Sequence, residues 1–285
     1  MQYTTLIETQ ELAERLDHPD WLICDCRFIL SKPQDGRISY DINHIPNAHY
    51  LDLELDLSGS KTALTGRHPL PNPEQLIKVL NQIGMSAKTQ VVVYDDSFGA
   101  IAARLWWLLK WLGHEQVAVL NGGWQKWLKE KRVLTQDKPS ANLGHFQGRC
   151  RDNLWVDSEF VYANLHEIFL MDVRAEERFY GRIEPFDKIP GHIPGAYNIP
   201  FEDNLALNGC YLSQPELREI YGELALDHHE NNVVVMCGSG VTACHTLLAL
   251  QHLGINHAKL YAGSWSEWIT VTDRPMERCL DKLRE

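Results

Sequence analysis

The stretch Val233-Val-Val-Met-Cys237-Gly-Ser-Gly-Val-Thr-Ala243 decides the fold of this chain. Its first four residues are apolar and β-prone, so they predict a buried strand that ends at Cys237. Small residues then lead directly into an apolar helical run at 244–250. A thiol between the carboxyl end of a strand and the amino end of a helix faces free backbone N–H groups and the positive end of the helix dipole. Because such surroundings favour the thiolate, we predict that Cys237 is a reactive nucleophile.

The chain contains two copies of one plan, because four motifs recur in the same order at offsets of 141 to 148 residues. The matched pairs are Leu22-Ile-Cys-Asp25-Cys-Arg27 with Leu170-Met-Asp172-Val-Arg174, His44-Ile-Pro-Asn-Ala48 with His192-Ile-Pro-Gly-Ala196, Val91-Val-Val-Tyr-Asp95 with Val233-Val-Val-Met-Cys237, and Leu120-Asn-Gly-Gly-Trp124 with Tyr261-Ala-Gly-Ser-Trp265. This spacing predicts a duplicated domain, with a net insertion between the second and third motifs of the first copy.

Short β-rich runs alternate with helical periods in both copies. We expect strands at 21–25, 91–95, 117–120, 168–173, 233–236 and 258–260, and helices at 9–17, 99–112 and 241–253 and from about 122 and 263. The alternation predicts an α/β fold in which each domain is a mainly parallel sheet with helices on both faces. Ligands of such sheets bind beyond the carboxyl ends of the strands, where Cys237 lies. The polar segment 139–153 contains Pro and Gly and is predicted to link a domain at 1–138 to one at 154–285.

Composition excludes several classes of protein. A length of 285 residues suits two domains, and 44% hydrophobic with 23% charged residues is typical of an ordinary globular protein. The net charge of −11 argues against nucleic acid or an anionic membrane as a partner, and no apolar run approaches the roughly 20 residues of a membrane span. Seven scattered cysteines, an odd number, and no visible signal peptide predict a reduced, cytoplasmic protein. We see no metal-binding spacing and no cofactor motif, so we expect neither.

The heptapeptide at 237–243, CGSGVTA, closely resembles the active-site loop of the rhodanese superfamily of sulfurtransferases, in the version carried by its 3-mercaptopyruvate-using members. Members that use thiosulfate tend to carry two basic residues after the cysteine. The resemblance extends over nearly the whole chain, because the flanking motifs recur in both halves. It implies two tandem rhodanese-like domains, of which the second is catalytic. The first should be catalytically silent, because Asp95 stands at the position of the cysteine and a carboxylate cannot carry a persulfide.

Two other classes of enzyme are disfavoured by the loop itself. A cysteine phosphatase would place an arginine six residues after the cysteine to hold phosphate oxygens, and Ala243 stands there instead. A serine hydrolase would need a glycine two residues before and two residues after its serine, and the sequence around Ser239 lacks this elbow.

The resemblance implies that Cys237 accepts sulfur from a small anionic donor as a persulfide, which a thiol such as thioredoxin, or cyanide, then removes. By similarity, Arg178 holds the substrate, and the loop residues Gly238, Gly240, Val241 and Thr242 surround it. The family's second arginine has no clean match, because Glu184-Pro-Phe-Asp-Lys188 lies there. Arg182, Lys188 or Arg67 are the alternatives. The neutral pair Gly238-Ser239 favours a monocarboxylate such as 3-mercaptopyruvate over a dianion such as thiosulfate.

The resemblance also implies a proton relay of Asp52, His68 and Ser239. His68 lies in the inserted part of the first copy and has no counterpart in the second copy, so the shared fold does not need it. Arg174 is expected to be structural, because Arg27 duplicates it. Two rival hypotheses stay open. One is a thiosulfate sulfurtransferase, and the other is a non-catalytic persulfide carrier or redox-sensing scaffold.

Overall fold

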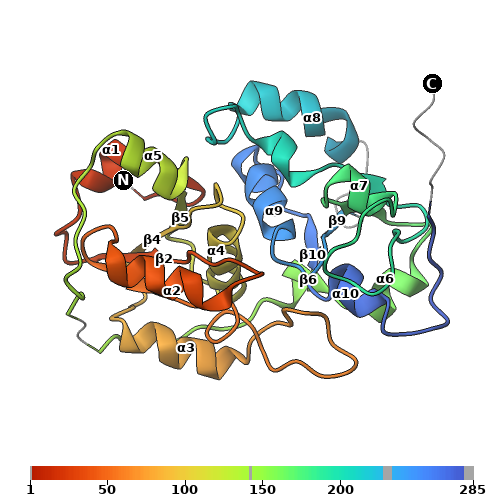
Figure 1. The fold of residues 1–285 in the computed structure, drawn as a ribbon, viewed down its shortest axis with the longest axis horizontal. Coiled ribbons are helices and arrows are strands. Elements are labelled where there is room, and N and C mark those ends of the chain that lie inside the picture. Colours follow the sequence, from red (N-terminus) through yellow and green to blue (C-terminus); the bar gives the residue numbers. More distant parts are fainter. Residues whose placement is uncertain (1, 141–142, 227–232, 279–285) are drawn as a thin grey trace. The chain divides into compact units, whose positions relative to one another are not determined.

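A computed structural model describes residues 2–140, 143–226 and 233–278 (Figure 1). The chain divides into two compact units. Unit 1 comprises residues 1–59, 70–152 and 206–211, and unit 2 comprises residues 60–69, 153–205 and 212–285. Each unit contains one five-stranded sheet whose strands are all parallel, which confirms the α/β fold with two similar domains.

The sheet of unit 1 has the strand order β1-β5-β4-β2-β3. Its strands are β1 (Leu6–Ile7), β2 (Trp21–Asp25), β3 (Ala48–Tyr50), β4 (Gln90–Tyr94) and β5 (Val117–Leu120), and its helices are α1 (Thr9–Ala13), α2 (Pro33–Ile42), α3 (Pro73–Gln82), α4 (Ala102–Trp111) and α5 (Gly123–Lys129). The sheet of unit 2 has the matching order β6-β10-β9-β7-β8. The order is the same because each strand of unit 2 repeats the corresponding strand of unit 1.

Unit 2 contains these elements: β6 (Trp155–Val156), α6 (Ser158–Ala163), β7 (Phe169–Asp172), α7 (Glu176–Phe179), β8 (Tyr197–Asn198), the 3₁₀ turn η2 (Phe201–Asn204), α8 (Gln214–Leu226), β9 (Val233–Met236), α9 (Ala243–His252), β10 (Lys259–Tyr261) and α10 (Ser264–Trp268); a further 3₁₀ turn, η1 (Asp152–Leu154), lies where unit 1 ends and unit 2 begins. The expected strands and helices are present, with boundaries that differ by a few residues. Helix α1 is shorter than expected, because Arg15 N–H bonds the carbonyl of Leu12 and turns the chain after Ala13.

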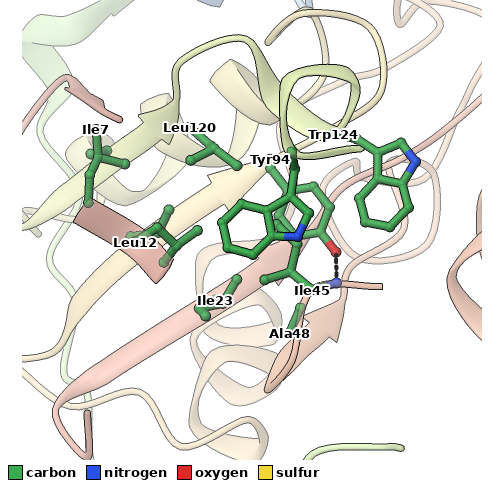
Figure 2. Close-up of a cluster of buried hydrophobic side chains, with 11 residues drawn as sticks. Ile7, Leu12, Ile23, Ile45, Ala48, Tyr94, Leu120 and Trp124 are labelled. Carbon is green, nitrogen blue, oxygen red and sulfur yellow. Dashed lines mark hydrogen bonds between the residues drawn. The ribbon is translucent and has the colours of Figure 1, made fainter. Parts of the chain in front are cut away.

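The core of unit 1 joins one face of its sheet to α1 and α5 (Figure 2). Ile23 and Tyr94 from the strands meet Leu12 of α1 and Trp124 of α5, and all are at most 6% exposed. The Tyr94 hydroxyl accepts a hydrogen bond from the backbone N–H of Ile45. Unit 2 repeats the arrangement around Leu170, Met236, Tyr261 and Trp265. The two cores are therefore equivalent, and the difference between the units lies at the ends of their strands.

Each sheet carries the same buried ion pair after its second strand. The guanidinium of Arg27 bonds the carboxylate of Asp25 at 2.7 Å, and that of Arg174 bonds Asp172 at 2.5 Å. Arg27 also stacks on Trp124 and Arg174 on Trp265, with distances to the ring centroids of 4.2 and 4.9 Å. Arg174 is fully buried in this pair. Its structural role, expected from the duplication, agrees with these contacts.

The second half of the predicted linker, residues 139–153, packs onto unit 1. Phe146 is buried and meets His114 edge-on, with ring centroids 5.6 Å apart. Backbone N–H groups of Arg149 and Arg151 donate to carbonyls of Leu112 and Trp111 at the end of α4. The segment has the polar composition of a linker. The buried ring of Phe146 and these hydrogen bonds nevertheless hold it against unit 1.

Candidate active site

The loop at Cys237 connects β9 to α9, as expected, and is fixed along its backbone. The thiol is 2% exposed, and the N–H of Gly240 donates to its sulfur at 3.2 Å. The start of α10 supports the loop, since Trp265 N–H bonds the carbonyl of Cys237 and Ser266 N–H bonds that of Gly238. The hydroxyl of Ser264 accepts the N–H of Cys237 at 3.1 Å. Backbone hydrogen bonds therefore fix the loop as a cradle around the sulfur.

Gly240 makes the tight curl of this loop possible. Its φ of +75° lies in the left-handed region, and a Cβ there would come within 2.2 Å of the carbonyl oxygen of Ala262. Only glycine avoids both the strain and the clash. Val241 is buried, and Thr242 is the residue from which α9 starts.

Unit 1 contains the counterpart of this loop, filled by its own carboxylate. Asp95 follows β4 and is fully buried. Its two oxygens accept backbone N–H groups of Ser97, Gly99, Ile101 and Ala102 at 2.7 to 2.9 Å. Burial raises the pKa of Asp95 above its ordinary value, although these N–H groups oppose the change. The N–H groups that could serve an anionic sulfur thus serve an aspartate, and helix α4 begins at Ala102, later than expected.

The segment 60–69 comes from the first half of the sequence but belongs to unit 2. We call it the arm. Its Gly66 packs so closely that a Cβ would lie 2.5 Å from the carbonyl oxygen of Gly263, and the N–H of Arg67 donates to the hydroxyl of Ser266 at 3.0 Å. The arm carries His68, whose Nδ1 lies 2.8 Å from the hydroxyl of Ser239. Both side chains are buried, at 2% and 6% exposure.

Asp52, the third residue expected in the relay, lies in unit 1. Its carboxylate accepts the backbone N–H groups of Glu54 and Leu55 at 2.8 and 3.1 Å and the hydroxyl of Tyr50 at 3.3 Å. These contacts hold the side chain in a turn of unit 1. Its part in a relay stays a prediction.

Two arginines flank Gly238. A Cβ at Gly238 would lie 2.8 Å from Nη2 of Arg67 and 3.0 and 3.2 Å from Nη2 and Nη1 of Arg178. Both guanidiniums also lie near the ring of Phe186, at 5.8 and 5.0 Å from its centroid. Of the three alternatives for a second arginine, Arg67 is therefore placed beside the loop. The other arginine, Arg182, pairs with Glu176 at 3.5 Å and stacks on Tyr180.

Sequence reasoning missed the two carboxylates that hold these arginines. Glu184 accepts Nε and Nη2 of Arg178 with both oxygens at 2.9 to 3.2 Å. Asp187 accepts Nη2 of Arg178 at 3.2 Å with one oxygen and Nη1 of Arg67 with the other. The acids stand in the stretch 184–188, which is noticeable in the sequence only because it lacks the arginine expected there. The pairing with Arg67 joins residues 120 positions apart, so local pattern carries no signal for it.

Within the described parts of the chain, no group of three histidine, cysteine or acidic residues is arranged to hold a metal ion, and no helix is long and apolar enough to cross a bilayer.

Comparisons with known proteins agree with this geometry. Residues 8–130 and 158–270 each match the family described as "Rhodanese-like domain". The chain is 45% identical to the "Probable 3-mercaptopyruvate sulfurtransferase" of Pseudomonas aeruginosa over 97% of this chain and 99% of that protein. It is 36% identical to the "Putative thiosulfate sulfurtransferase SseB" of Mycobacterium tuberculosis over 96% of both. It is similar to the structure of 3-mercaptopyruvate sulfurtransferase from Leishmania major with a TM-score of 0.82 and 31% identity, covering 93% of this chain and 74% of that one.

Proposed function

The chain belongs to the family of rhodanese-like domains, and we propose that it is a 3-mercaptopyruvate sulfurtransferase working through a persulfide on Cys237. The observation that carries the proposal is the pair Arg67 and Arg178 beside Gly238, one residue from the nucleophile. Guanidiniums at this place suit the carboxylate of a small donor whose sulfur must reach Cys237. The relative with 45% identity, which is named for this activity, supports the choice of donor.

In the first half-reaction, the Cys237 thiolate attacks the sulfur of 3-mercaptopyruvate. An S–S bond forms and the C–S bond of the donor breaks, so its electron pair passes to the carbon and leaves the enolate of pyruvate. The former thiol proton of the donor can remain on the outer sulfur of the persulfide. The N–H of Gly240, which donates to the sulfur of Cys237, stabilises the negative charge of the attacking thiolate.

The enolate needs a proton before it leaves as pyruvate. Ser239 and His68 are hydrogen-bonded beside the nucleophile, and we assign them the transfer of that proton. Asp52 would orient His68 in this scheme, by the resemblance alone. Thiosulfate makes no such demand, because its leaving group, sulfite, is a stable anion. The relay therefore has a purpose only with a carbon leaving group.

Arg178 is the group we assign to the donor carboxylate. Glu184 occupies the edge formed by Nε and Nη2, whereas the terminal edge of Nη1 and Nη2 faces Gly238. Asp187 also accepts from Nη2, so Nη1 is the nitrogen assigned to a charge-assisted hydrogen bond with the donor carboxylate. Arg67 adds a second cation from the arm. Gly238, Gly240, Val241 and Thr242 supply the surrounding backbone, and no observation gives Arg182 a direct role.

In the second half-reaction, a thiol such as thioredoxin, or cyanide, removes the outer sulfur and restores the thiolate. Competition assays with thioredoxin, a small thiol and cyanide identify the preferred acceptor. We also propose a cytoplasmic location, which the free thiols of Cys24, Cys26, Cys150, Cys210, Cys237 and Cys244 support. Cell fractionation tests it.

Steady-state kinetics with 3-mercaptopyruvate and thiosulfate in parallel test the proposed donor. We expect a higher kcat/KM with 3-mercaptopyruvate, and the opposite preference would favour the thiosulfate sulfurtransferase for which a 36% identical relative is named. No turnover with either donor would favour a persulfide carrier or redox-sensing scaffold. The two buried arginine–carboxylate pairs argue against that rival, since a scaffold needs no anion site next to its thiol.

A further inference from the structure

We propose that Glu184 and Asp187 are positioning residues that fix the two arginines beside Gly238 and, by their charge, make the site select a monoanionic sulfur donor over a dianionic one. The inference deepens the proposed function, because it concerns the donor site of the same reaction. It assigns substrate choice to carboxylates outside the cysteine loop.

Glu184 fixes the orientation of Arg178. It takes the Nε and Nη2 side of the guanidinium with both oxygens, and one of these oxygens also accepts the backbone N–H groups of Phe186 and Asp187 at 3.1 and 3.2 Å. Its side chain is only 3% exposed. A carboxylate held this firmly leaves the guanidinium few rotamers, so its terminal edge stays directed at Gly238.

Asp187 joins the two arginines. One oxygen binds Arg178 and the other binds Arg67, and the side chain is 4% exposed. Without a shared carboxylate, two guanidiniums on either side of one glycine would repel each other. Phe186 supports the same arrangement, because its ring lies near both cations. The carboxylate of Asp187, which follows α7, therefore links Arg67 of the arm to Arg178.

The charges in this cluster balance. Its guanidiniums are those of Arg67, Arg174 and Arg178, and its carboxylates are those of Asp172, Glu184 and Asp187, connected by the ion pairs. None of the six side chains is more than 22% exposed, so water screens them poorly. These six groups therefore place hydrogen-bond donors beside Gly238 but add no net positive charge there. A single carboxylate can be held by such a site, whereas a second negative charge would be repelled by Glu184 and Asp187 without compensation.

The inference predicts the effect of neutralising either acid. Asp187→Asn and Glu184→Gln keep an oxygen acceptor of similar shape but remove one negative charge. We expect the site to become more favourable for a dianion, even if both arginines lose some order. The affinity for thiosulfate relative to pyruvate should rise about tenfold in each variant. Asp187→Glu, which retains the charge, should keep the ratio of the wild type.

The test is titration calorimetry with pyruvate as the monoanion and thiosulfate as the dianion, in a Cys237→Ser background that prevents turnover. The control is Asp273→Asn, which makes the same change in net charge at an exposed residue of the same unit. It should leave the ratio unchanged. Circular dichroism checks that each variant folds. Should both amide variants fail to fold, Arg67→Gln supplies the reverse comparison and must weaken thiosulfate more than pyruvate.

Equal changes in the affinities for both anions, or a weaker relative affinity for thiosulfate in the amide variants, would overturn the inference. The proposed function is judged separately, by turnover of the enzyme with Cys237 intact. If that enzyme transfers sulfur from neither donor while the binding ratio still shifts, the proposed function fails and the charge selection stands. If the enzyme turns over 3-mercaptopyruvate but the ratio does not shift, only the charge selection fails.

Discussion

A single residue type at one position separates the two units chemically. After β9 the chain has Cys237, and after β4 it has Asp95, yet both side chains accept N–H groups of the loop that follows. The cradle is therefore a property of the fold, and what it holds is a property of the residue. A carboxylate is already an anion and saturates the cradle by itself. The thiolate of Cys237 accepts the N–H of Gly240 and, in the proposed reaction, can bond a second sulfur as a persulfide.

We expect Cys237 to be the residue that carries transferred sulfur. After incubation with 3-mercaptopyruvate, mass spectrometry of the intact protein should find one added sulfur, and Cys237→Ser should abolish both this addition and turnover. Cys244 is the matched control. It is fully buried, and its thiol bonds the carbonyl of Gly240 at 3.4 Å, so Cys244→Ser should retain the added sulfur. Sulfur on Cys244 or Cys150 in the wild type would refute the mechanism.

Arg178→Ala should raise KM for 3-mercaptopyruvate and lower kcat/KM by an amount equivalent to about 2–5 kcal/mol, because a buried charged contact to the donor is lost. Arg178→Lys should recover only part of this loss, since an ammonium cannot bind Glu184, Asp187 and the donor together as a planar guanidinium does. Arg182→Ala, on the neighbouring part of the chain, is the control. Initial rates over a range of donor concentrations measure all three, and a normal kcat/KM in Arg178→Ala would reassign Arg178 to a purely structural ion pair.

His68→Ala tests whether the contact with Ser239 moves a proton. With 3-mercaptopyruvate we expect kcat to fall by about 10²-fold or more, the usual contribution of a general acid. With thiosulfate kcat should change little, because sulfite leaves without a proton. Stopped-flow measurement of persulfide formation with each donor gives the comparison, and a parallel loss with both donors would mean that His68 only holds the arm in place.

At the scale of elements, the sequence predicts the strands and helices that have a periodic pattern of apolar residues. It does not predict segments whose packing depends on one buried residue. The strands β2, β5 and β9 lie where expected, because runs of β-branched residues with turns on both sides leave little choice. The repeat also predicted a structural Arg174, because Arg27 duplicates it, whereas the ion pairs of these arginines with Asp172 and Asp25 are seen only in the structure. The docking of 144–151 onto α4 was not predictable from composition, since one buried Phe146 outweighs the polar residues around it. Glu184 and Asp187 were missed for a different reason, because the contact of Asp187 with Arg67 joins residues 120 positions apart and leaves no local pattern.

The ion pairs at the end of α4 make part of the stability depend on pH. Glu115 bonds Lys110 at 2.6 Å and Arg151 at 2.5 Å. Burial would raise the pKa of Glu115, but these two cations outweigh it and lower the pKa below its ordinary 4.5. A lowered folded-state pKa gives stability that is present above pH 4.5 and is lost as the pH falls through the folded-state value.

Glu115→Gln should therefore lower Tm at pH 7 and lose this effect in acid, so that the Tm values of variant and wild type converge as the pH drops below about 4.5. Thermal melts across this range measure the difference. A constant difference in Tm at all pH values would mean that Glu115 acts through packing alone.

At the scale of the whole molecule, duplication explains why so much of the fold is visible in the sequence. The exceptions are the segments that leave their own half: the arm at 60–69 belongs to unit 2, and 206–211 belongs to unit 1. Both lie between the second and third motifs of the repeat, where the two copies differ in length, so neither could be placed by analogy. The contact of His68 with Ser239 spans 171 positions for this reason, and only the family resemblance brought the two residues together beforehand.

Asp95 should matter for the stability of unit 1 and not for sulfur transfer. Asp95→Ala leaves four backbone N–H groups without their acceptor, which should cost about 3 kcal/mol in the free energy of unfolding. Urea denaturation measures this loss. The folded fraction should still take up one sulfur on Cys237, and a variant that is stable but accepts no sulfur would contradict the silence of unit 1.

Each half of the sequence gives one short segment, 60–69 or 206–211, to the unit formed mainly by the other half, and this limits how the gene can be divided. A gene cut between the two repeats would encode two polypeptides, each lacking a piece of its own unit and carrying a piece of the other's. The polypeptide 154–285 would hold the nucleophile but neither Arg67 nor His68. We expect it to be inactive alone and to regain activity only when 1–153 is supplied in trans, as in split-protein complementation. Deleting either half would therefore also remove a segment that belongs to the unit formed mainly by the other half.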